Sequence, residues 1–307
     1  AILQKADGPG VRMKSLPCKK IDAFAGASSS GNPAGVVYLN EADELAPKEM
    51  LEIASACRGW VSEVGFVAKL AHGTYWLRYY SSEREVDFCG HATVAIAYDL
   101  IRNDRSLITG KSVKLRTKNA EVEALNRIPA EDAVYISSPP PVIRQLNVSS
   151  GECATALKVR PAGNIQTRAI IIAGLDTLIV EAASLDIVLG LAPDLGQLAE
   201  FCVSFGFDIL LVYADEVSTP GCAYRTRVFA PRYGYLEDPA TGSGNSAFGN
   251  FLFARQKWTE GVLTVEQNGS KTRPNFVKLV LDRMSDGNVR VMFGGSARVR
   301  LQGEYFL

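Results

Sequence analysis

Residues 89–98 read CGHATVAIAY, and residues 240–254 read ATGSGNSAFGNFLFA. Each stretch begins with glycine and small or polar residues, and each continues as a run that is apolar on nearly every face. A helix without a polar face is buried on all sides. Two such helices, in a chain otherwise rich in strand patterns, predict a sheet curled around a central helix in each half of the chain.

The same order of elements surrounds both stretches. Ahead of the first we expect a helix that starts near Pro47 and strands over residues 64–68 and 75–80. Ahead of the second we expect a helix opened by Pro193 and strands over residues 209–213 and 224–230. The two glycine-rich helices should end near Ile101 and Ala254. Further strand patterns occupy residues 113–116, 170–173, 178–182, 263–266, 276–281, 289–293 and 298–301.

Equivalent residues in the two halves indicate a duplication. Glu63 and Asp208 each stand at the start of an apolar strand, and Cys89 and Thr241 each precede a glycine-rich helix. The offset between partners grows slowly along the chain, as loop insertions would make it grow. The alternative is a chance agreement between two ordinary α/β stretches.

The predicted fold class is α/β (α+β), with two pseudo-symmetric halves, each a barrel-like, mostly antiparallel sheet around one helix. Pro139–Pro141 cannot lie inside a helix or a sheet, so they mark the crossover between the halves. We expect an N-terminal half over residues 16–135 and a C-terminal half over residues 136–307, with approximate boundaries and chain ends that can cross over. Residues 1–15 lack the apolar core of a signal peptide, and we interpret them as a leader or cloning remnant.

The composition narrows the function classes. Lys plus Arg and Asp plus Glu both number 33, so there is no general attraction to nucleic acid or to an anionic membrane. No apolar run is long enough to cross a bilayer. The six cysteines are scattered without zinc-site spacing, and two histidines exclude a His-rich metal site. We therefore expect a protein of the reducing cytoplasm without a zinc site or a His-rich metal site.

The two glycine-rich helix starts predict an anion site. The first N–H groups of a helix have no partner within the helix, and glycine lets a ligand approach that backbone closely. If the starts at Gly90 and Gly242 face one cleft, together they can hold a carboxylate.

Three side chains are candidates for acid/base chemistry. His91 lies beside Gly90, where a proton-transfer role competes with that of a capping or solvated histidine. Asp238 precedes a proline, so it either orients a polar substrate group or forms a turn. Glu63 borders an apolar strand, which raises a carboxyl pKa if the side chain is desolvated; the alternative is an exposed strand-end glutamate.

Competing motifs point elsewhere. Cys89 could serve as a carbon-acid base at a helix N-terminus, but its repeat partner is Thr241, which cannot act as a second thiol. Gly242-x-Gly244-x-x-Ala247, with Glu266 about 20 residues on, matches a dinucleotide fingerprint, yet a long loop separates it from the preceding strand. The glycine-rich residues 31–35 lack the lysine of a phosphate-binding loop.

Four segments, in order, resemble the phenazine-biosynthesis PhzF-like family. They are residues 22–36 around Gly31-Asn32-Pro33, residues 62–66, residues 89–93 and residues 237–243. The resemblance covers most of the chain. It implies the diaminopimelate-epimerase-like fold, a homodimer, no cofactor or metal, and isomerisation by proton transfer.

The resemblance also implies roles for single residues. Glu63 resembles the family's acid/base, and His91 and Asp238 resemble its polar partners. The expected substrate contacts are Asn32, Gly90, Gly242 and Ser243. The leading hypothesis is a cofactor-independent, PhzF-like isomerase of a small carboxylate. The alternatives are an amino-acid racemase, epimerase or dehydratase that uses Cys89, and a non-catalytic metabolite-binding protein of the same fold.

Overall fold

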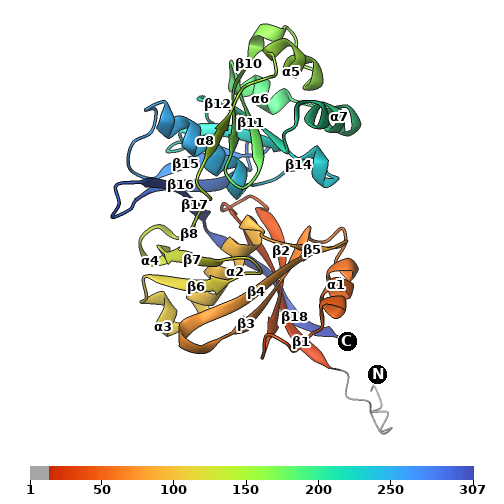
Figure 1. Cartoon of the computed structure of the whole chain (residues 1–307), viewed down its shortest axis with the longest axis vertical. Helices are drawn as coiled ribbons and strands as arrows, with labels where there is room; N and C mark the ends of the chain where they lie inside the picture. Colours follow the sequence, from red (N-terminus) through yellow and green to blue (C-terminus); the bar gives the residue numbers. More distant parts are fainter. Residues whose placement is uncertain (1–13) are drawn as a thin grey trace.

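The computed structural model describes residues 14–307, so the expected leader over residues 1–15 lies almost wholly outside the described residues. The chain forms two lobes stacked along the long axis of the molecule (Figure 1). The first lobe is built from β1 (Ser15–Ala23), β2 (Asn32–Leu39), α1 (Pro47–Ala56), β3 (Glu63–Lys69), β4 (Thr74–Ser81), β5 (Glu85–Val86), α2 (Gly90–Asn103), α3 (Arg105–Ile108), β6 (Ser112–Arg116), β7 (Glu121–Asn126), α4 (Ile128–Glu131) and β8 (Val134–Ser137).

The remaining elements follow in chain order. They are β9 (Val142–Arg144), α5 (Ser150–Ala156), β10 (Ile165–Ile172), β11 (Asp176–Ala182), α6 (Leu185–Gly190), α7 (Leu195–Phe205), β12 (Ile209–Ala214), β13 (Tyr224–Phe229), β14 (Glu237–Asp238), α8 (Gly242–Ala254), β15 (Leu263–Gln267), β16 (Asn275–Arg283), β17 (Val289–Gly295) and β18 (Ala297–Phe306). The predicted order of elements is present in both halves. One detail is wrong: α7 begins at Leu195, and Asp194 caps it by accepting from the Gln197 N–H, so Pro193 lies outside the helix.

The two lobes repeat one strand pattern. In the first, β2–β3 and β4–β6 are parallel, and the pairs β1–β2, β3–β4, β6–β7 and β7–β8 are antiparallel. In the second, β11–β12 and β13–β15 are parallel, and β10–β11, β12–β13, β15–β16 and β16–β17 are antiparallel. This agreement confirms the predicted fold class of two pseudo-symmetric, mostly antiparallel halves.

Strands are exchanged between the lobes. β8 of the first lobe pairs with β17 of the second, which joins the two sheets. The chain passes from β8 through Pro139–Pro141 to β9, which pairs with β10. It returns from β17 to β18, which pairs with β1 and completes the first lobe, as the blue strand in the red and yellow lobe shows (Figure 1).

Each lobe encloses one apolar helix. α2 packs against β1, β2, β3, β7, β8 and β18, and α8 packs against β10, β11, β12, β16 and β17. Their side chains are buried along almost the whole length, which confirms the interpretation of helices without a polar face. The start of each helix is N-capped by an extended residue, Cys89 for α2 and Thr241 for α8.

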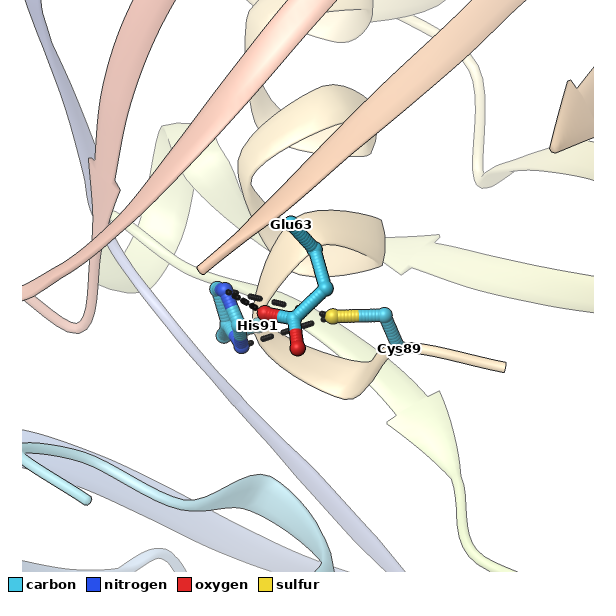
Figure 2. Close-up of side chains that lie close together, drawn as sticks. All are labelled: Glu63, Cys89 and His91. Carbon is cyan, nitrogen blue, oxygen red and sulfur yellow. Dashed lines mark hydrogen bonds and ion pairs between the residues drawn. The ribbon is translucent and has the colours of Figure 1, made fainter. Parts of the chain in front are cut away.

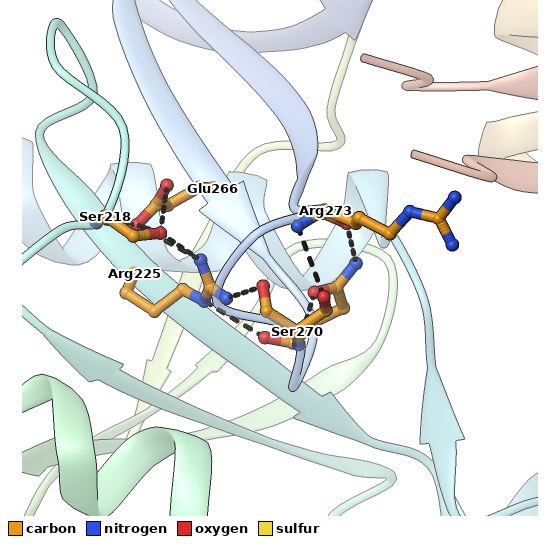
Figure 3. Close-up of polar contacts among 6 residues, drawn as sticks. Ser218, Arg225, Glu266, Ser270 and Arg273 are labelled. Carbon is orange, nitrogen blue, oxygen red and sulfur yellow. Dashed lines mark hydrogen bonds and ion pairs between the residues drawn. The ribbon is translucent and has the colours of Figure 1, made fainter. Parts of the chain in front are cut away.

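A buried ion pair fixes the loops of the second lobe. Arg225 on β13 and Glu266 on β15 are both fully buried, with Arg225 Nη1 3.1 Å from Glu266 Oε1 (Figure 3). Ser218 donates its hydroxyl to Glu266, and Arg225 donates to the backbone oxygens of Asn268 and Ser270. The pair therefore attaches two loops to the sheet. It also occupies Glu266, which leaves this carboxylate unable to bind a ribose and removes the acidic partner that the dinucleotide alternative requires.

In the described part of the chain, no helix is both long enough and apolar enough to cross a membrane.

Candidate active site between the two lobes

Glu63, Cys89 and His91 meet at the N-terminus of α2. Glu63 is the first residue of β3, where it lies opposite Ala34 of β2 and Ser81 of β4. Its Oε2 is 3.4 Å from His91 Nε2, and Cys89 Sγ is 3.4 Å from His91 Nδ1 (Figure 2). All three side chains are largely enclosed, with Glu63 19% and His91 12% exposed, so a ligand that reaches them is removed from bulk water.

Asp238, on the second lobe, lies close enough to Glu63 and His91 for their charges to affect its pKa. It forms β14 with Glu237 and lies opposite Val228 of β13. Thr241 Oγ1 donates to its Oδ2 at 2.5 Å, and Asn32 Nδ2 donates to its Oδ1 at 2.7 Å. Since Asn32 begins β2 of the first lobe and also donates to the Ala240 carbonyl at 2.8 Å, it connects the two lobes at the site.

The N-termini of the two central helices share one aromatic neighbour. A Cβ atom added at Gly90 would lie 3.1 Å from Phe293 Cζ, and one added at Gly242 would lie 2.2 Å from Phe293 Cε2. The ring of Phe293, on β17, thus lies against the first residue of both helices. Only glycine fits at Gly242, and the two helix starts come together as the anion-site prediction requires. Ser243, the second residue of α8, is partly exposed beside them.

The surroundings of the site raise the pKa values of Asp238 and Cys89, which favours their protonated, neutral forms. Burial raises the pKa of Asp238 to about 6, with the Glu63 carboxylate acting in the same direction and His91 and the Thr241 hydroxyl acting against it. Burial, followed by the charge of Glu63, raises the pKa of the Cys89 thiol well above its ordinary value, although the backbone amides of His91 and Ala92 oppose the shift. Cys89 is therefore a protonated thiol at neutral pH.

Sequence reasoning missed two contributors. Gln267, buried at the end of β15, donates to the Asp238 carbonyl at 2.8 Å and accepts from the Thr241 N–H at 2.9 Å, so it positions the loop that carries Asp238. Tyr235, which is 37% exposed, has a pKa raised by burial and then by the charges of Asp238 and Glu63. No sequence motif marks either residue.

The raised pKa of Asp238 predicts a pH-dependent stability. The protonated carboxyl is favoured in the folded state, so its stabilising contribution is complete below the ordinary pKa and is lost as the pH rises through about 6. Asp238→Asn mimics the neutral form. We expect the variant to be more stable than the parent chain by about 1–3 kcal/mol at pH 8, with the difference shrinking towards pH 4.

Urea denaturation at both pH values measures this difference. Asp286→Asn in an exposed loop is the matched control and should give no gain at pH 8, because hydrogen bonds with Asn288 lower the pKa of Asp286. An Asp238→Asn variant that is less stable than the parent at pH 8 would contradict the assignment.

Comparison with known proteins agrees with this architecture. The family of phenazine biosynthesis-like proteins (PhzC-PhzF) matches residues 21–303. The chain is 26% identical to "Antisense-enhancing sequence 1" of Schizosaccharomyces pombe, covering 94% of this chain and 98% of that protein. It is 30% identical to an "Uncharacterized isomerase" of Deinococcus radiodurans, with 74% of this chain and 73% of that protein covered.

Solved structures share the fold. A PhzF-family phenazine biosynthesis protein of Bacillus anthracis superposes with a TM-score of 0.83 at 22% identity, over 96% of this chain and 100% of the other. A hydroxyproline epimerase of Agrobacterium vitis superposes with a TM-score of 0.57 at 13% identity, over 95% of this chain and 93% of the other. From its match over residues 21–303, and from its fold, the chain belongs to the phenazine biosynthesis-like (PhzC-PhzF) family.

Proposed function

We propose that this chain is a cofactor-independent isomerase that moves a proton on a small carboxylate metabolite. The observation that carries the proposal is the convergence of Glu63, His91 and Asp238 where the N-termini of α2 and α8 meet. Acid/base groups that surround an anion-binding backbone are what proton transfer next to a carboxylate requires. Relatives in Bacillus subtilis and Deinococcus radiodurans bear the name isomerase, which supports the same class.

Some of these residues bind the substrate, and others exchange protons with it. The helix starts at Gly90 and Gly242 hold the substrate carboxylate with backbone N–H groups, and Ser243 adds a hydroxyl at the same end of α8. Asn32 and Asp238 form the polar bridge that sets the distance between the lobes. Asp238, with a pKa of about 6, can exchange a proton with a polar substrate group near neutral pH.

Glu63 acts as the acid/base in this scheme. As the carboxylate, it removes a proton from the substrate carbon, and as the acid it returns that proton to another atom of the same molecule. His91, 3.4 Å away, steadies the carboxylate and supplies a second polar contact. No atom leaves the substrate, so the product is an isomer and no other reactant is needed.

Cysteine-based racemisation or epimerisation is the alternative. Cys89 Sγ lies within 3.4 Å of His91 Nδ1, so the thiol is at the site. Two features disfavour it: the equivalent residue in the second lobe is Thr241, and burial keeps the Cys89 thiol protonated.

Solvent-deuterium incorporation tests the proposal. The purified chain is incubated in D₂O with a panel of cyclic and amino-acid carboxylates, and mass spectrometry reads the label. We expect incorporation at a carbon of at least one carboxylate without any added cofactor. A chain that labels no member of the panel, yet binds one of them, would support a metabolite-binding protein instead.

We also propose that the protein is a homodimer in the cytoplasm. The exposed apolar side chains of Val299 and Leu301 on β18, 45% and 54% exposed, favour a partner along this strand. All six cysteines are unpaired, as in reducing compartments. Sedimentation velocity measures the mass, and a chain that stays monomeric at micromolar concentration would argue against the dimer.

A further inference from the structure

Glu63, Cys89 and His91 present three different metal-ligating groups to one point. One ligand atom from each residue lies within 4.8 Å of the other two (Figure 2). We propose that these side chains form a binding site for a thiophilic divalent cation, with Zn²⁺ as the best match. The site goes beyond the proposed isomerisation, which uses no metal.

Two of the three distances between ligand atoms are close to those of a tetrahedral zinc site. Bond lengths of about 2.3 Å to sulfur and 2.0–2.1 Å to nitrogen place a thiolate and an imidazole nitrogen about 3.6 Å apart. The same geometry places nitrogen and carboxylate oxygen about 3.3 Å apart. In the structure, His91 Nε2 is 3.9 Å from Cys89 Sγ and 3.4 Å from Glu63 Oε2. These two distances are within a few tenths of an ångström of the tetrahedral values, and the third, between Cys89 Sγ and the Glu63 carboxylate, is no more than 4.8 Å.

The donor set selects the ion. A thiolate, an imidazole and a carboxylate suit zinc, whereas magnesium and calcium prefer oxygen donors alone. The three side chains come from β3 and the N-terminus of α2, and they supply three of the four ligands of a tetrahedral ion, which leaves one position for another ligand. That position can take water or the carboxylate of a small molecule.

The charges around the cluster favour a cation over the free thiol. Glu63 supplies a carboxylate to the cluster, with its Oε2 3.4 Å from His91 Nε2. A divalent ion replaces the proton of the Cys89 thiol and neutralises this carboxylate. Binding should consequently release about one proton per ion at neutral pH.

The position of the metal site predicts that a bound ion lowers the activity. On the function proposed above, Glu63 and His91 take part in proton transfer, so an ion that occupies both side chains blocks the reaction and competes with the substrate for them. The ion would act as a reversible inhibitor.

Two titrations of the full, chelator-treated chain test the proposal. ZnCl₂ is followed by calorimetry, and CoCl₂ by the near-ultraviolet band of a cobalt–thiolate bond. We expect one equivalent of each ion, the thiolate band, and release of about one proton. Cys89→Ser should remove the band and weaken Zn²⁺ binding by about tenfold or more. Cys222→Ser, which changes a partly buried thiol far along the chain in the second lobe, is the matched control and should keep both signals.

Two results would overturn the proposal. The first is that the chain does not bind one equivalent of Zn²⁺, and the second is that Zn²⁺ binding and the cobalt–thiolate band are both retained in Cys89→Ser. If Cys89→Ser does not fold, Glu63→Gln replaces it, because Glu63 is partly exposed and glutamine keeps its shape. Unchanged Zn²⁺ affinity in Glu63→Gln would then overturn the site. These titrations need no substrate, so their failure is distinct from failure of the deuterium experiment.

Discussion

Glu63→Gln is expected to reduce the rate of deuterium incorporation into the substrate by about 100-fold or more. Glutamine keeps the length and the hydrogen-bonding capacity of the side chain at the start of β3, but it cannot accept and return a proton. The neighbour His91, 3.4 Å from the Glu63 carboxylate, loses a charged partner while keeping its place on α2. The loss should appear in turnover, because the proposed function assigns substrate binding to the helix N-termini and not to Glu63.

Two variants make the comparison decisive. Glu85→Gln removes a carboxylate that pairs with Arg78 and Lys118 and is not part of the cluster at α2, so it should leave the exchange rate unchanged. Cys89→Ala, once shown to be folded, should retain most of the exchange. Retained exchange in Glu63→Gln together with abolished exchange in Cys89→Ala would promote the cysteine-based alternative.

Arg225→Met is expected to lower the free energy of unfolding by about 3–5 kcal/mol. The substitution keeps much of the volume but leaves Glu266 as a fully buried carboxylate without its countercharge. It also removes the donors to the backbone oxygens of Asn268 and Ser270 (Figure 3). Most of the lost stability comes from the uncompensated charge of Glu266. The two backbone carbonyls that lose their hydrogen-bond donor add to the loss.

A double variant separates the two contributions. Arg225→Met with Glu266→Gln leaves no charge at this buried pair and keeps an acceptor for Ser218, so it should recover about 2 kcal/mol of the loss. Lys48→Met breaks an exposed pair with Glu52 on α1 and should cost less than about 0.5 kcal/mol. Urea denaturation of the four chains measures these differences. We expect the double variant to be about 2 kcal/mol more stable than Arg225→Met. Equal stability of these two variants, or of Arg225→Met and the parent, would contradict the account.

The periodicity of the sequence predicts the elements well because burial decides them. α2 and α8 are apolar on all faces since each is enclosed by strands, and that pattern is visible without coordinates. The strand starts at Glu63 and after Asp208 were likewise predicted from apolar runs. The start of α7 was misplaced because an aspartate cap, rather than the nearby proline, begins that helix.

The site is harder to predict, because its contacts join distant parts of the chain. Asn32 reaches Asp238 across the interface between the lobes, and Gln267 positions Thr241 from a different strand. Neither contact leaves a spacing that can be read in the sequence. The roles of Glu63, His91 and Asp238 remain predictions, which the exchange experiments address.

The strand exchange has a consequence for synthesis of the protein. Translation releases β1 near the beginning of the described chain and β18 after every other described strand, although the two pair along their lengths. While the second lobe is being made, the edge of β1 that β18 will cover stays unpaired, and such an edge invites pairing with other chains. The first lobe therefore cannot close on the ribosome ahead of the second, and a chaperone that shields an open sheet edge would raise the yield of folded protein.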